Sequence, residues 1–403
     1  MSASTSNLET TCPYCGVGCG VSAKLQDDSI IAVSGDKTHP ANYGALCVKG
    51  SALHETMGDH GRLLYPSVNG QRVDWDTALD TVAERLNEVR EEHGPDAIAF
   101  YLSGQLLTED YYVANKLAKG FLGTGNVDTN SRLCMSSAVA SYKRAFGADA
   151  VPCSYEDLDH CDLLILVGSN AAWTHPVLYR RMAAAKKRNP TMRVVVIDPR
   201  RTASCDLADL HLPINPGADG YLFAGLLAWL QQTGASRSEY IAQHTEGYRE
   251  ALEAANAISF AETARLVGLE TDVLETFYQW FAETDKTITF YSQGINQSSS
   301  GTDKGNAIIN CHLATGRIGK VGAGPFSITG QPNAMGGREV GGLANQLAAH
   351  MDYNPGDLRT VADFWATDQL CQQPGMKAVD LFDAVADGRI KAIGIMATNP
   401  VVS

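Results

Sequence analysis

The sequence predicts an α/β fold in which a small N-terminal unit precedes two domains built on mainly parallel sheets. From Trp75 onward, continuous apolar runs alternate with amphipathic helical patterns, which is typical of strands covered by helices on both faces. Residues 1–62 lack such patterns and are rich in glycine, turns and cysteine. A chain of 403 residues is also longer than one simple core usually allows, which favours two or three domains.

The N-terminal unit carries four cysteines at a spacing that suits electron transfer. Cys12, Cys15 and Cys19 lie in one short loop and Cys47 follows, giving C-x2-C-x3-C-x27-C. Four thiolates in this arrangement can hold a [4Fe–4S] cluster. A structural zinc site is the alternative, but zinc sites usually pair two close knuckles, and here the second half contributes a single cysteine. The spacing therefore favours the cluster over zinc.

Five apolar runs are predicted to form buried strands, and the first of them follows an amphipathic helix. That helix carries an apolar stripe at helical spacing, which includes Leu79, Val82 and Leu86. The runs cover 96–102, 162–169, 193–199, 287–292 and 391–398. Because they are continuously apolar rather than alternating, parallel sheets between helices are the expected arrangement.

Polar loops at the carboxyl ends of these strands point to a nucleotide site, since ligands of parallel α/β sheets bind there. The second strand runs into Gly168, Ser169 and Asn170, directly before a helix. Glycine permits close backbone approach, and the two polar residues can cap the helix and offer donors to a phosphate.

The next loops complete the pattern of a Rossmann-like nucleotide-binding domain. Asp198 could accept hydrogen bonds from ribose hydroxyls, with Arg200 and Arg201 beside it to hold a pyrophosphate. Asp219, in the segment N-P-G-A-D-G, could bind the donor edge of a guanine. Each loop alone is better explained as an ordinary turn with a helix cap, but three loops at successive crossovers together favour a nucleotide.

The net charge of −13 argues against nucleic-acid binding, which needs a basic surface, and is compatible with a basic electron-donor protein. No apolar run reaches the roughly 18 residues of a transmembrane helix, so no membrane association is expected. The N-terminus shows neither the apolar core of a signal peptide nor a twin-arginine signal. With ten cysteines and no such signal, the cytoplasm, where thiols stay reduced, is the expected compartment.

Several motifs resemble those of one family, over essentially the whole chain. They are C-P-Y-C-G-V-G-C-G (12–20), A-L-C-V-K-G (45–50), N-S-R-L-C-M-S-S-A-V-A (130–140), G-S-N (168–170) and T-G-Q-P-N-A-M-G-G-R-E-V-G (329–341). Together they resemble the molybdopterin oxidoreductases that carry bis-molybdopterin guanine dinucleotide (bis-MGD), most closely the cytoplasmic assimilatory nitrate reductases. The resemblance implies a [4Fe–4S] domain over 1–62, a Rossmann-like MGD-binding domain over 135–302, and a discontinuous α/β domain of 63–134 and 303–403.

By this resemblance Cys134 is the thiolate ligand of molybdenum, and the start of a helix around it would stabilise a thiolate. Lys49 matches the lysine that bridges cluster and pterin, and Gln105 and Asn130 match positions that contact the cofactor. A buried structural cysteine and a solvated lysine are the alternatives at positions 134 and 49. A structural role is expected for the other cysteines, which are Cys153, Cys161, Cys205, Cys311 and Cys371.

The resemblance also assigns residues near the pterin and the substrate. Gln297 matches a position that faces the pterin, and Gln293 stands where some relatives carry methionine. Arg338 and Glu339 correspond to a charged pair beside the substrate funnel, where a guanidinium would attract a small anion, although a pure salt-bridge role for the arginine is the alternative. Met135 follows the metal-binding cysteine, where formate dehydrogenases of the family typically carry histidine.

The implied reaction is the reduction of nitrate to nitrite by oxygen-atom transfer to molybdenum, in nitrate assimilation, with electrons delivered through the [4Fe–4S] cluster. The implied donor is ferredoxin, flavodoxin or an NADH-dependent reductase subunit. A cytoplasmic formate dehydrogenase and a non-catalytic iron–sulfur electron-transfer subunit are the alternatives. Met135 disfavours the first, and the retained Cys134 and Arg338 disfavour the second.

The family continues for several hundred residues beyond the last residue of this sequence and includes a C-terminal barrel domain, which is absent here. We therefore expect an N-terminal portion of a longer enzyme. An unpaired sheet edge after strand 391–398 and weak or absent turnover of this portion alone are the expected consequences.

Overall fold

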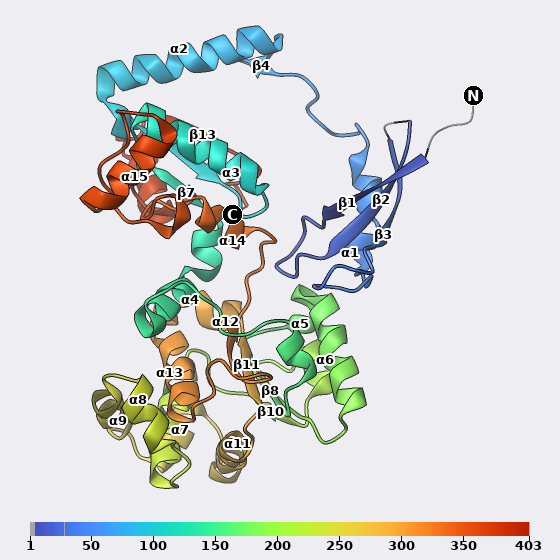
Figure 1. Cartoon of the computed structure of the whole chain (residues 1–403), viewed down its shortest axis with the longest axis vertical. Coiled ribbons are helices and arrows are strands. Elements are labelled where there is room, and N and C mark those ends of the chain that lie inside the picture. The colour runs from blue at the N-terminus through green and yellow to red at the C-terminus, as the bar shows by residue number, and fades with distance from the viewer. Residues whose placement is uncertain (1–4, 28, 403) are drawn as a thin grey trace.

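The computed structural model describes residues 5–27 and 29–402 and divides into three parts (Figure 1). The N-terminal part is a three-stranded antiparallel sheet of β1 (Thr5–Thr11), β2 (Gly20–Gln26) and β3 (Ser29–Gly35), followed by the short helix α1 (Val48–Ser51). The sequence patterns did not predict this sheet, because β1 is exposed along its whole length and carries no apolar run. The cysteine loop connects β1 to β2 and so begins and ends on a fixed pair of strands.

The second part is a five-stranded parallel sheet in the order β10-β9-β8-β11-β12. Its strands are β8 (Leu163–Val167), β9 (Arg193–Ile197), β10 (Leu210–Leu212), β11 (Thr287–Tyr291) and β12 (Gly324–Ser327). Three of them lie within predicted runs and are almost wholly buried. Neither edge strand was predicted, because β10 has three residues and β12 contains glycine and proline, which are tolerated at a sheet edge.

Helices cover both faces of this sheet, as its continuous hydrophobicity predicts. Leu163 and Ile165 of β8 join one core with α4 (Ser131–Phe146), α7 (Asp219–Gln232), α11 (Thr271–Glu283) and α13 (Gly301–Ala314). Leu164 and Leu166 join a second core with α6 (Pro176–Arg188), and this core also includes Cys12 and Cys19. The cysteine loop is therefore packed against the α6 side of the sheet.

The third part is a three-stranded parallel sheet in the order β13-β6-β7, with β6 (Ile98–Leu102), β7 (Val127–Thr129) and β13 (Ala392–Ile395). Two distant stretches of the chain thus share one sheet, as the discontinuous domain requires. However, β12 lies beyond residue 302 and α13 crosses it, and both belong to the five-stranded sheet and its core, so this sheet spans the expected boundary.

One expectation about this third part is wrong, and the predicted helix before its first strand is present but only partly covered. The run 391–398 yields only a four-residue strand of mostly intermediate burial, because β13 is an edge strand that pairs with β6 alone among the described strands. The apolar stripe of α2 (Trp75–His93) is also largely uncovered, with Leu79 59% and Val82 55% exposed, whereas Leu86 packs against the core around β6.

The remaining elements connect these parts. The helices are α3 (Thr108–Asn115), α5 (Ala171–Thr174), α8 (Ser238–His244), α9 (Tyr248–Ala255), α10 (Phe260–Val267), α12 (Gln293–Asn296), α14 (Ala334–Glu339), α15 (Pro355–Trp365) and α16 (Ala378–Ala386), with a π-helix, η3, at Lys116–Leu122. The small hairpin strands are β4 (Ser67–Val68) and β5 (Gln71–Arg72). Among the described residues, none of the helices combines the length and the apolar character that a membrane crossing needs.

Candidate cofactor and active site

The four N-terminal cysteines line one enclosed cavity, together with Lys49 and the beginning of α6. Burial raises the pKa of Cys12 and Cys15, and burial together with the neighbouring thiolates raises the pKa of Cys19 to about 12. Four thiols that line one cavity, three of them with raised pKa values, suit a tightly bound cationic iron core, because the metal binds the thiolate form and compensates the mutual repulsion. These residues therefore fit a [4Fe–4S] cluster.

Three polar side chains that the sequence reasoning missed hold the cluster loop in place. The buried Asn42 side chain accepts a hydrogen bond from Gly20 N at 2.8 Å and donates to the carbonyl oxygens of Gly20 and Ala45 at 3.0 and 2.9 Å. It thereby joins the first three cysteines to the segment that carries the fourth. The Tyr155 hydroxyl donates to Gly16 O at 2.8 Å, and Arg180 donates to the backbone oxygen of residue 46, next to Cys47.

Cys134 lies in the first turn of α4 and is 5% exposed. Its Sγ is 3.5 Å from Gln293 Nε2, which donates to it, and 3.6 Å from Thr329 Oγ1. A β-carbon at Gly330 would lie 3.7 Å from the same sulfur, so glycine leaves space there. A buried thiol that faces polar donors and a side-chain-free position fits a metal ligand better than a packed structural cysteine.

A single segment, Thr329–Gly330, lies between Cys134 and the cluster loop. Gly16 N donates to Gly330 O at 3.0 Å, and a β-carbon at Gly16 would lie only 2.1 Å from Thr329 O. On the other side His175, which is fully buried, contacts Thr329 O through Nε2 at 2.7 Å. Burial lowers the pKa of His175, so its imidazole is neutral, with Nε2–H donating to this carbonyl and Nδ1 accepting from the neighbouring threonine hydroxyl.

A cavity of about 590 Å³ opens at the carboxyl ends of the five-stranded sheet, where the sequence predicts the nucleotide. The predicted residues that line it are Gly168, Asn170, Asp198, Arg200, Asp219 and Gln293. Gly168 has a φ of +52° and packs against Gly294, where a β-carbon would meet the glycine backbone at 2.7 Å. Glycine is thus required at the point where the loop after β8 crosses the loop after β11.

Two carboxylates of this cavity already have partners. Asp219 Oδ2 accepts from Lys304 Nζ at 2.8 Å, and both side chains are buried, so the lysine of α13 is a site residue that sequence reasoning missed. Asp198 Oδ1 accepts from the backbone N–H of Arg200 at 2.9 Å, which shapes the loop between them. The arginine side chain itself is exposed.

Two predicted residues lie outside this cavity. Ser169 is buried, and its Oγ has no hydrogen-bond partner among the described residues, so it is neither a cap nor a cavity-lining donor here. Gln297 directly follows α12 with an exposed side chain. The roles that the resemblance gives to both remain predictions.

Gln105 and Asn130 both make hydrogen bonds that fix loops of the third part. Gln105 Nε2 donates to the carbonyl oxygen of Pro13 at 2.6 Å, next to the first cluster ligand. Asn130 Oδ1 accepts from Gly104 N at 2.9 Å, and its Nδ2 donates to Thr398 Oγ1 at 3.3 Å. Gln105 therefore joins the third part to the cluster loop, whereas both partners of Asn130 lie within the third part.

Arg338 and Glu339 do not pair with one another. Arg338 is 4% exposed and pairs with Asp149, with Nε and Oδ2 2.6 Å apart, while its Nη1 lies 3.3 Å from Met135 Sδ. Glu339 points elsewhere and pairs with His350 at 3.0 Å. The two charges are neighbours in a short helix, α14, and adjacent helical residues project about 100° apart, so they do not face one another.

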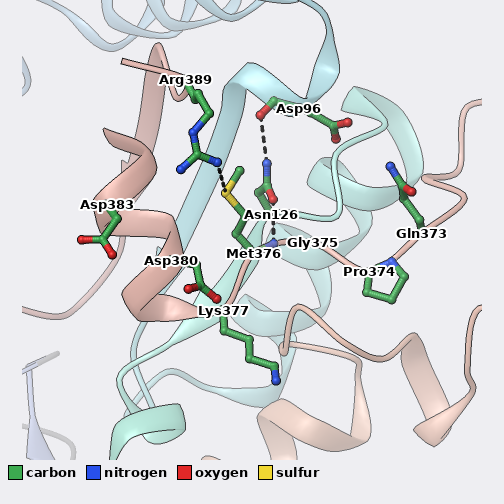
Figure 2. A pocket seen from close by; sticks show the side chains of 10 residues that line it. All are labelled: Asp96, Asn126, Gln373, Pro374, Gly375, Met376, Lys377, Asp380, Asp383 and Arg389. Carbon is green, nitrogen blue, oxygen red and sulfur yellow. Dashed lines mark hydrogen bonds between the residues drawn. The ribbon is translucent and has the colours of Figure 1, made fainter. Parts of the chain in front are cut away.

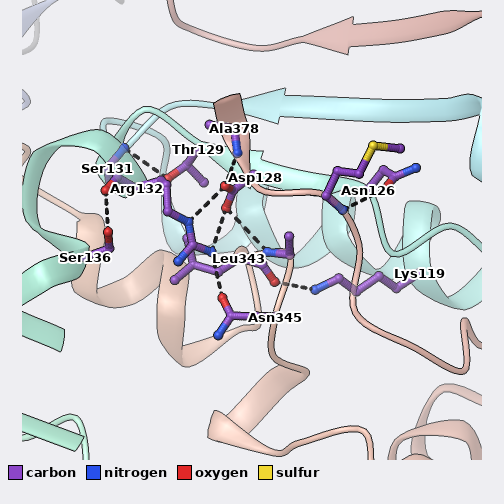
Figure 3. Close-up of polar contacts among 12 residues, drawn as sticks. Lys119, Asn126, Asp128, Thr129, Ser131, Arg132, Ser136, Leu343, Asn345 and Ala378 are labelled. Atoms are coloured by element: carbon purple, nitrogen blue, oxygen red, sulfur yellow. Dashed lines mark hydrogen bonds and ion pairs between the residues drawn. The ribbon is translucent and has the colours of Figure 1, made fainter. Parts of the chain in front are cut away.

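A buried polar network supports the helix that carries Cys134 (Figure 3). Asp128 is fully buried and accepts from Arg132 Nε at 3.0 Å and from the backbone N–H of Ala378 at 2.7 Å. Arg132 also donates to Asn345 Oδ1 at 2.7 Å. The start of α4 is thus tied to the loop that follows Arg338.

A second cavity of similar size, about 570 Å³, lies in the third part (Figure 2). Asp380, Asp383 and Arg389 line it along and just beyond α16, opposite Asn126, whose Oδ1 accepts from the backbone N–H of Met376 at 2.9 Å. None of the predicted site residues lines this cavity, and we assign it no role.

The family models match the two regions that this geometry separates. The Fe4S4 domain of the molybdopterin oxidoreductases matches residues 6–59, and the molybdopterin oxidoreductase model matches residues 62–403. Among solved structures, acetylene hydratase from Pelobacter acetylenicus has a similar fold, with a TM-score of 0.67 and 21% identity over 76% of this chain and 42% of that one.

Curated relatives carry related names. A nitrate reductase from Klebsiella oxytoca is 58% identical over 98% of this chain and 45% of its own length. A periplasmic nitrate reductase from Desulfovibrio desulfuricans is 37% identical over 98% of this chain and 54% of its own length. A formate dehydrogenase subunit from Methanocaldococcus jannaschii is 30% identical over 98% of this chain and 58% of its own length. The chain spans about half the length of these relatives.

The cofactors that the sequence predicts, a [4Fe–4S] cluster and molybdenum bis-MGD, agree with both family matches and with the donor sets around the cysteine cavity and the 590 Å³ cavity. The chain therefore belongs to the molybdopterin oxidoreductase family.

Proposed function

We propose that this chain acts in the molybdenum-dependent reduction of nitrate to nitrite. The observation that carries the proposal is that Cys134, Met135 and Arg338 lie together. Cys134 is a buried thiol, and the Arg338 guanidinium contacts Met135, the residue that directly follows this cysteine. The 58% identity to a protein named nitrate reductase supports it. The net reaction consumes nitrate, two electrons and two protons and yields nitrite and water.

The bound molybdenum cofactor would supply oxygen-atom transfer, and the [4Fe–4S] cluster would supply single electrons. Cys134 would hold the metal, and Lys49 would lie between the cluster and the pterin. Arg338 would orient the substrate anion with directed N–H donors. Because Asp149 balances its charge and fixes its plane, recognition rests on hydrogen-bond geometry more than on net attraction.

For the electron route, we propose that electrons enter at the cluster and leave toward Cys134 past the Thr329–Gly330 segment. The direct contact of this segment with Gly16 on one side, and its position 3.6 Å from Cys134 Sγ on the other, support this route. We further propose a role in cytoplasmic nitrate assimilation, with ferredoxin, flavodoxin or an NADH-dependent reductase subunit as donor. The five cysteines outside the cofactor sets form no disulfide among the described residues, which supports a reducing compartment.

Two other functions are less well supported. A formate dehydrogenase would be expected to carry histidine at position 135, where this chain has the methionine that contacts Arg338. The relative named formate dehydrogenase is also less similar to this chain than the relative named nitrate reductase. A purely electron-transferring subunit has no need of a buried thiol such as Cys134 or of the nucleotide cavity.

The test is turnover of the complete, cofactor-loaded protein with reduced methyl viologen, offering nitrate and formate in parallel and counting iron and molybdenum. We expect nitrate reduction, with Cys134→Ala abolishing it while the iron content stays unchanged. Cys153→Ala, which alters a cysteine outside both cofactor cavities, is the matched control and should retain activity. Formate oxidation without nitrate reduction would refute the proposal.

A further inference from the structure

Helix α6 concentrates positive charge in a chain whose net charge is −13. Its sequence, P-V-L-Y-R-R-M-A-A-A-K-K-R, holds five cations and no acidic residue. Arg180, Lys187 and Arg188 are spaced seven and eight residues apart, so they project from one side of the helix, and all three side chains are exposed. The buried face of α6 is apolar and packs on the sheet, which leaves this basic side directed outward.

The basic side of α6 lies directly beside the cluster cavity. The first residues of the helix, Pro176 and Val177, line the cavity that holds the four cysteines. Val177 and Arg180 also line a neighbouring hollow of about 410 Å³. Figure 1 shows α6 against the N-terminal part, whose loop 41–45 forms the opposite wall of this hollow.

The charges that face this hollow are mainly positive. Arg180, Arg181 and Arg188 line it, and Asp159 is the one carboxylate among its described lining residues. Asp159 is shared, because its two oxygens accept from Arg181 and Arg188, each at 2.6 Å. Arg180 forms no ion pair among those found in the described part of the chain and instead donates to the backbone oxygen next to Cys47.

Neighbouring acidic groups do not cancel this excess. Glu156 lies at the rim, where its Oε1 accepts from the Tyr43 hydroxyl at 3.4 Å, and Asp209 is engaged by Lys186. Lys187 extends the positive side of α6 away from both. Tyr43 is 53% exposed and lines the hollow, so it adds an apolar surface between the cations.

We propose that this arginine-faced hollow, together with the basic side of α6, is the docking surface for an acidic protein that carries one electron at a time to the [4Fe–4S] cluster. The inference rests on the proposed function, since the docked carrier would supply the two electrons that nitrate reduction needs. In each encounter the carrier is oxidised, the cluster is reduced, and no bond is made or broken. Two encounters serve one nitrate, and the two protons are consumed when water is released.

Charge complementarity explains why the site lies here. The net negative charge of the chain repels an acidic carrier at long range, so only a local positive surface can capture it and select its orientation. That surface is adjacent to the cavity of the group that must receive the electron, which keeps the transfer distance short. Weak, small interfaces of this kind suit redox partners that must dissociate after each transfer.

The experiment compares two electron sources for the holoenzyme. One is a plant-type [2Fe–2S] ferredoxin, which serves as the acidic carrier, and the other is methyl viologen, a small molecule that needs no docking surface. In Lys187→Glu/Arg188→Glu, we expect the KM for ferredoxin at low ionic strength to rise about tenfold or more, with viologen-driven turnover unchanged. Neither residue contacts the cluster loop, so the iron content should stay the same.

A binding measurement separates docking from turnover. Calorimetric titration of ferredoxin into the oxidised holoenzyme should show weaker binding in the double variant, and wild-type binding should weaken as salt is raised. Arg249→Glu changes an exposed cation of α9, far along the chain from the cluster, and should behave as the wild type. Asp159→Asn removes the one carboxylate among the described lining residues of the hollow. It should therefore strengthen ferredoxin binding, whereas the double variant should weaken it.

The outcomes are distinguishable. If the wild type fails to reduce nitrate with viologen, the proposed function is wrong. If viologen-driven turnover is intact and the double variant binds and uses ferredoxin as well as the wild type does, the docking surface is wrong. Tighter binding of ferredoxin to the double variant would equally overturn it, because the sign of the surface charge would then be reversed.

Discussion

At the scale of single residues, the partner of Arg338 fixes how its guanidinium would meet the substrate anion that we propose. The guanidinium is buried against Asp149 and reaches Met135, so it is held in one orientation. A free arginine beside Glu339 would swing and would present only a diffuse charge. The buried pair carries a desolvation cost, and such costs are tolerated where a charged group must be fixed.

Asp149→Asn should therefore be costly. It leaves the Arg338 charge buried without a counter-ion, which we expect to lower the free energy of unfolding by about 3–5 kcal/mol and to raise the KM for nitrate. Denaturant titration and steady-state kinetics with methyl viologen measure the two effects. Asp303→Asn, which breaks the exposed pair with Arg144, is the control and should change neither quantity. Equal stability of both variants would show that the buried pair is unimportant.

At the scale of elements, one lysine holds the loop that follows Arg338. Lys119 lies in the π-helix Lys116–Leu122 and is fully buried. Its Nζ donates to the carbonyl oxygens of Gly341, Leu343 and Gln346 at 2.7, 2.8 and 2.7 Å. The contact with Leu343 is drawn in Figure 3. A π-helix places an extra residue in the turn, and here it brings the ammonium group into reach of all three oxygens.

Lys119→Met keeps the aliphatic chain but leaves three buried carbonyl groups without a donor. We expect a loss of about 2–4 kcal/mol in the free energy of unfolding. Lys116→Met, in the same π-helix but with its ammonium beside aromatic rings instead of carbonyls, is the control and should cost much less. Limited proteolysis should show new cleavage within 341–346 only in the first variant, and an intact loop there would contradict the assigned role.

The stability of the chain should also depend on Lys119 at alkaline pH. Burial lowers the pKa of Lys119 to about 8, with Cys371 and Asp128 opposing the shift and Arg132 adding to it. The unfolded chain keeps this proton up to about pH 10.4. Between these values the folded state holds fewer protons, so the free energy of unfolding should rise with pH. Urea titrations at pH 7.5 and 9.5 should show this rise in the wild type and a smaller one in Lys119→Met.

At the scale of the whole molecule, the three parts meet at the cluster loop. Gly16 contacts Thr329–Gly330 after the five-stranded sheet, Tyr155 donates to Gly16 O, and Gln105 of the third part donates to Pro13 O. One loop therefore sets the position of the cluster relative to Cys134. The electron route that we propose would therefore run through this junction.

Gly16→Ala tests the junction, because its β-carbon would lie 2.1 Å from a backbone oxygen that cannot move without displacing Thr329. We expect the cluster to assemble but its oxidation by nitrate, followed by stopped-flow absorbance, to slow by about tenfold or more. Gly58→Ala is the control, since nothing lies within 4 Å of a β-carbon there. Unchanged oxidation kinetics in Gly16→Ala would rule out a role for this contact in electron transfer.

Charge illustrates the difference between composition and position. The net charge of −13 favours a basic partner, yet the surface beside the cluster is lined by three arginines and one aspartate. Composition averages over the whole surface, whereas a docking protein meets one face. Only the packing of α6 against the N-terminal part brings those arginines to the cluster.

The sequence by itself determined the features that depend on local spacing. Three of the four cluster ligands lie within eight residues, the buried strands are continuous apolar runs, and loops that line the nucleotide cavity directly follow three of those strands. Such features need no knowledge of distant contacts, because strand burial and loop position follow from neighbouring residues.

Tertiary structure alone decided the features that join distant segments. It paired Arg338 with Asp149, Lys304 with Asp219 and β13 with β6, and it placed His175 against Thr329. None of these pairs has a sequence signal, since each partner is common in its own local context and the pairing is set by how sheets and helices pack. The cofactor ligands of this protein are therefore visible in the spacing of its sequence, whereas the contacts that support them exist only in the folded chain.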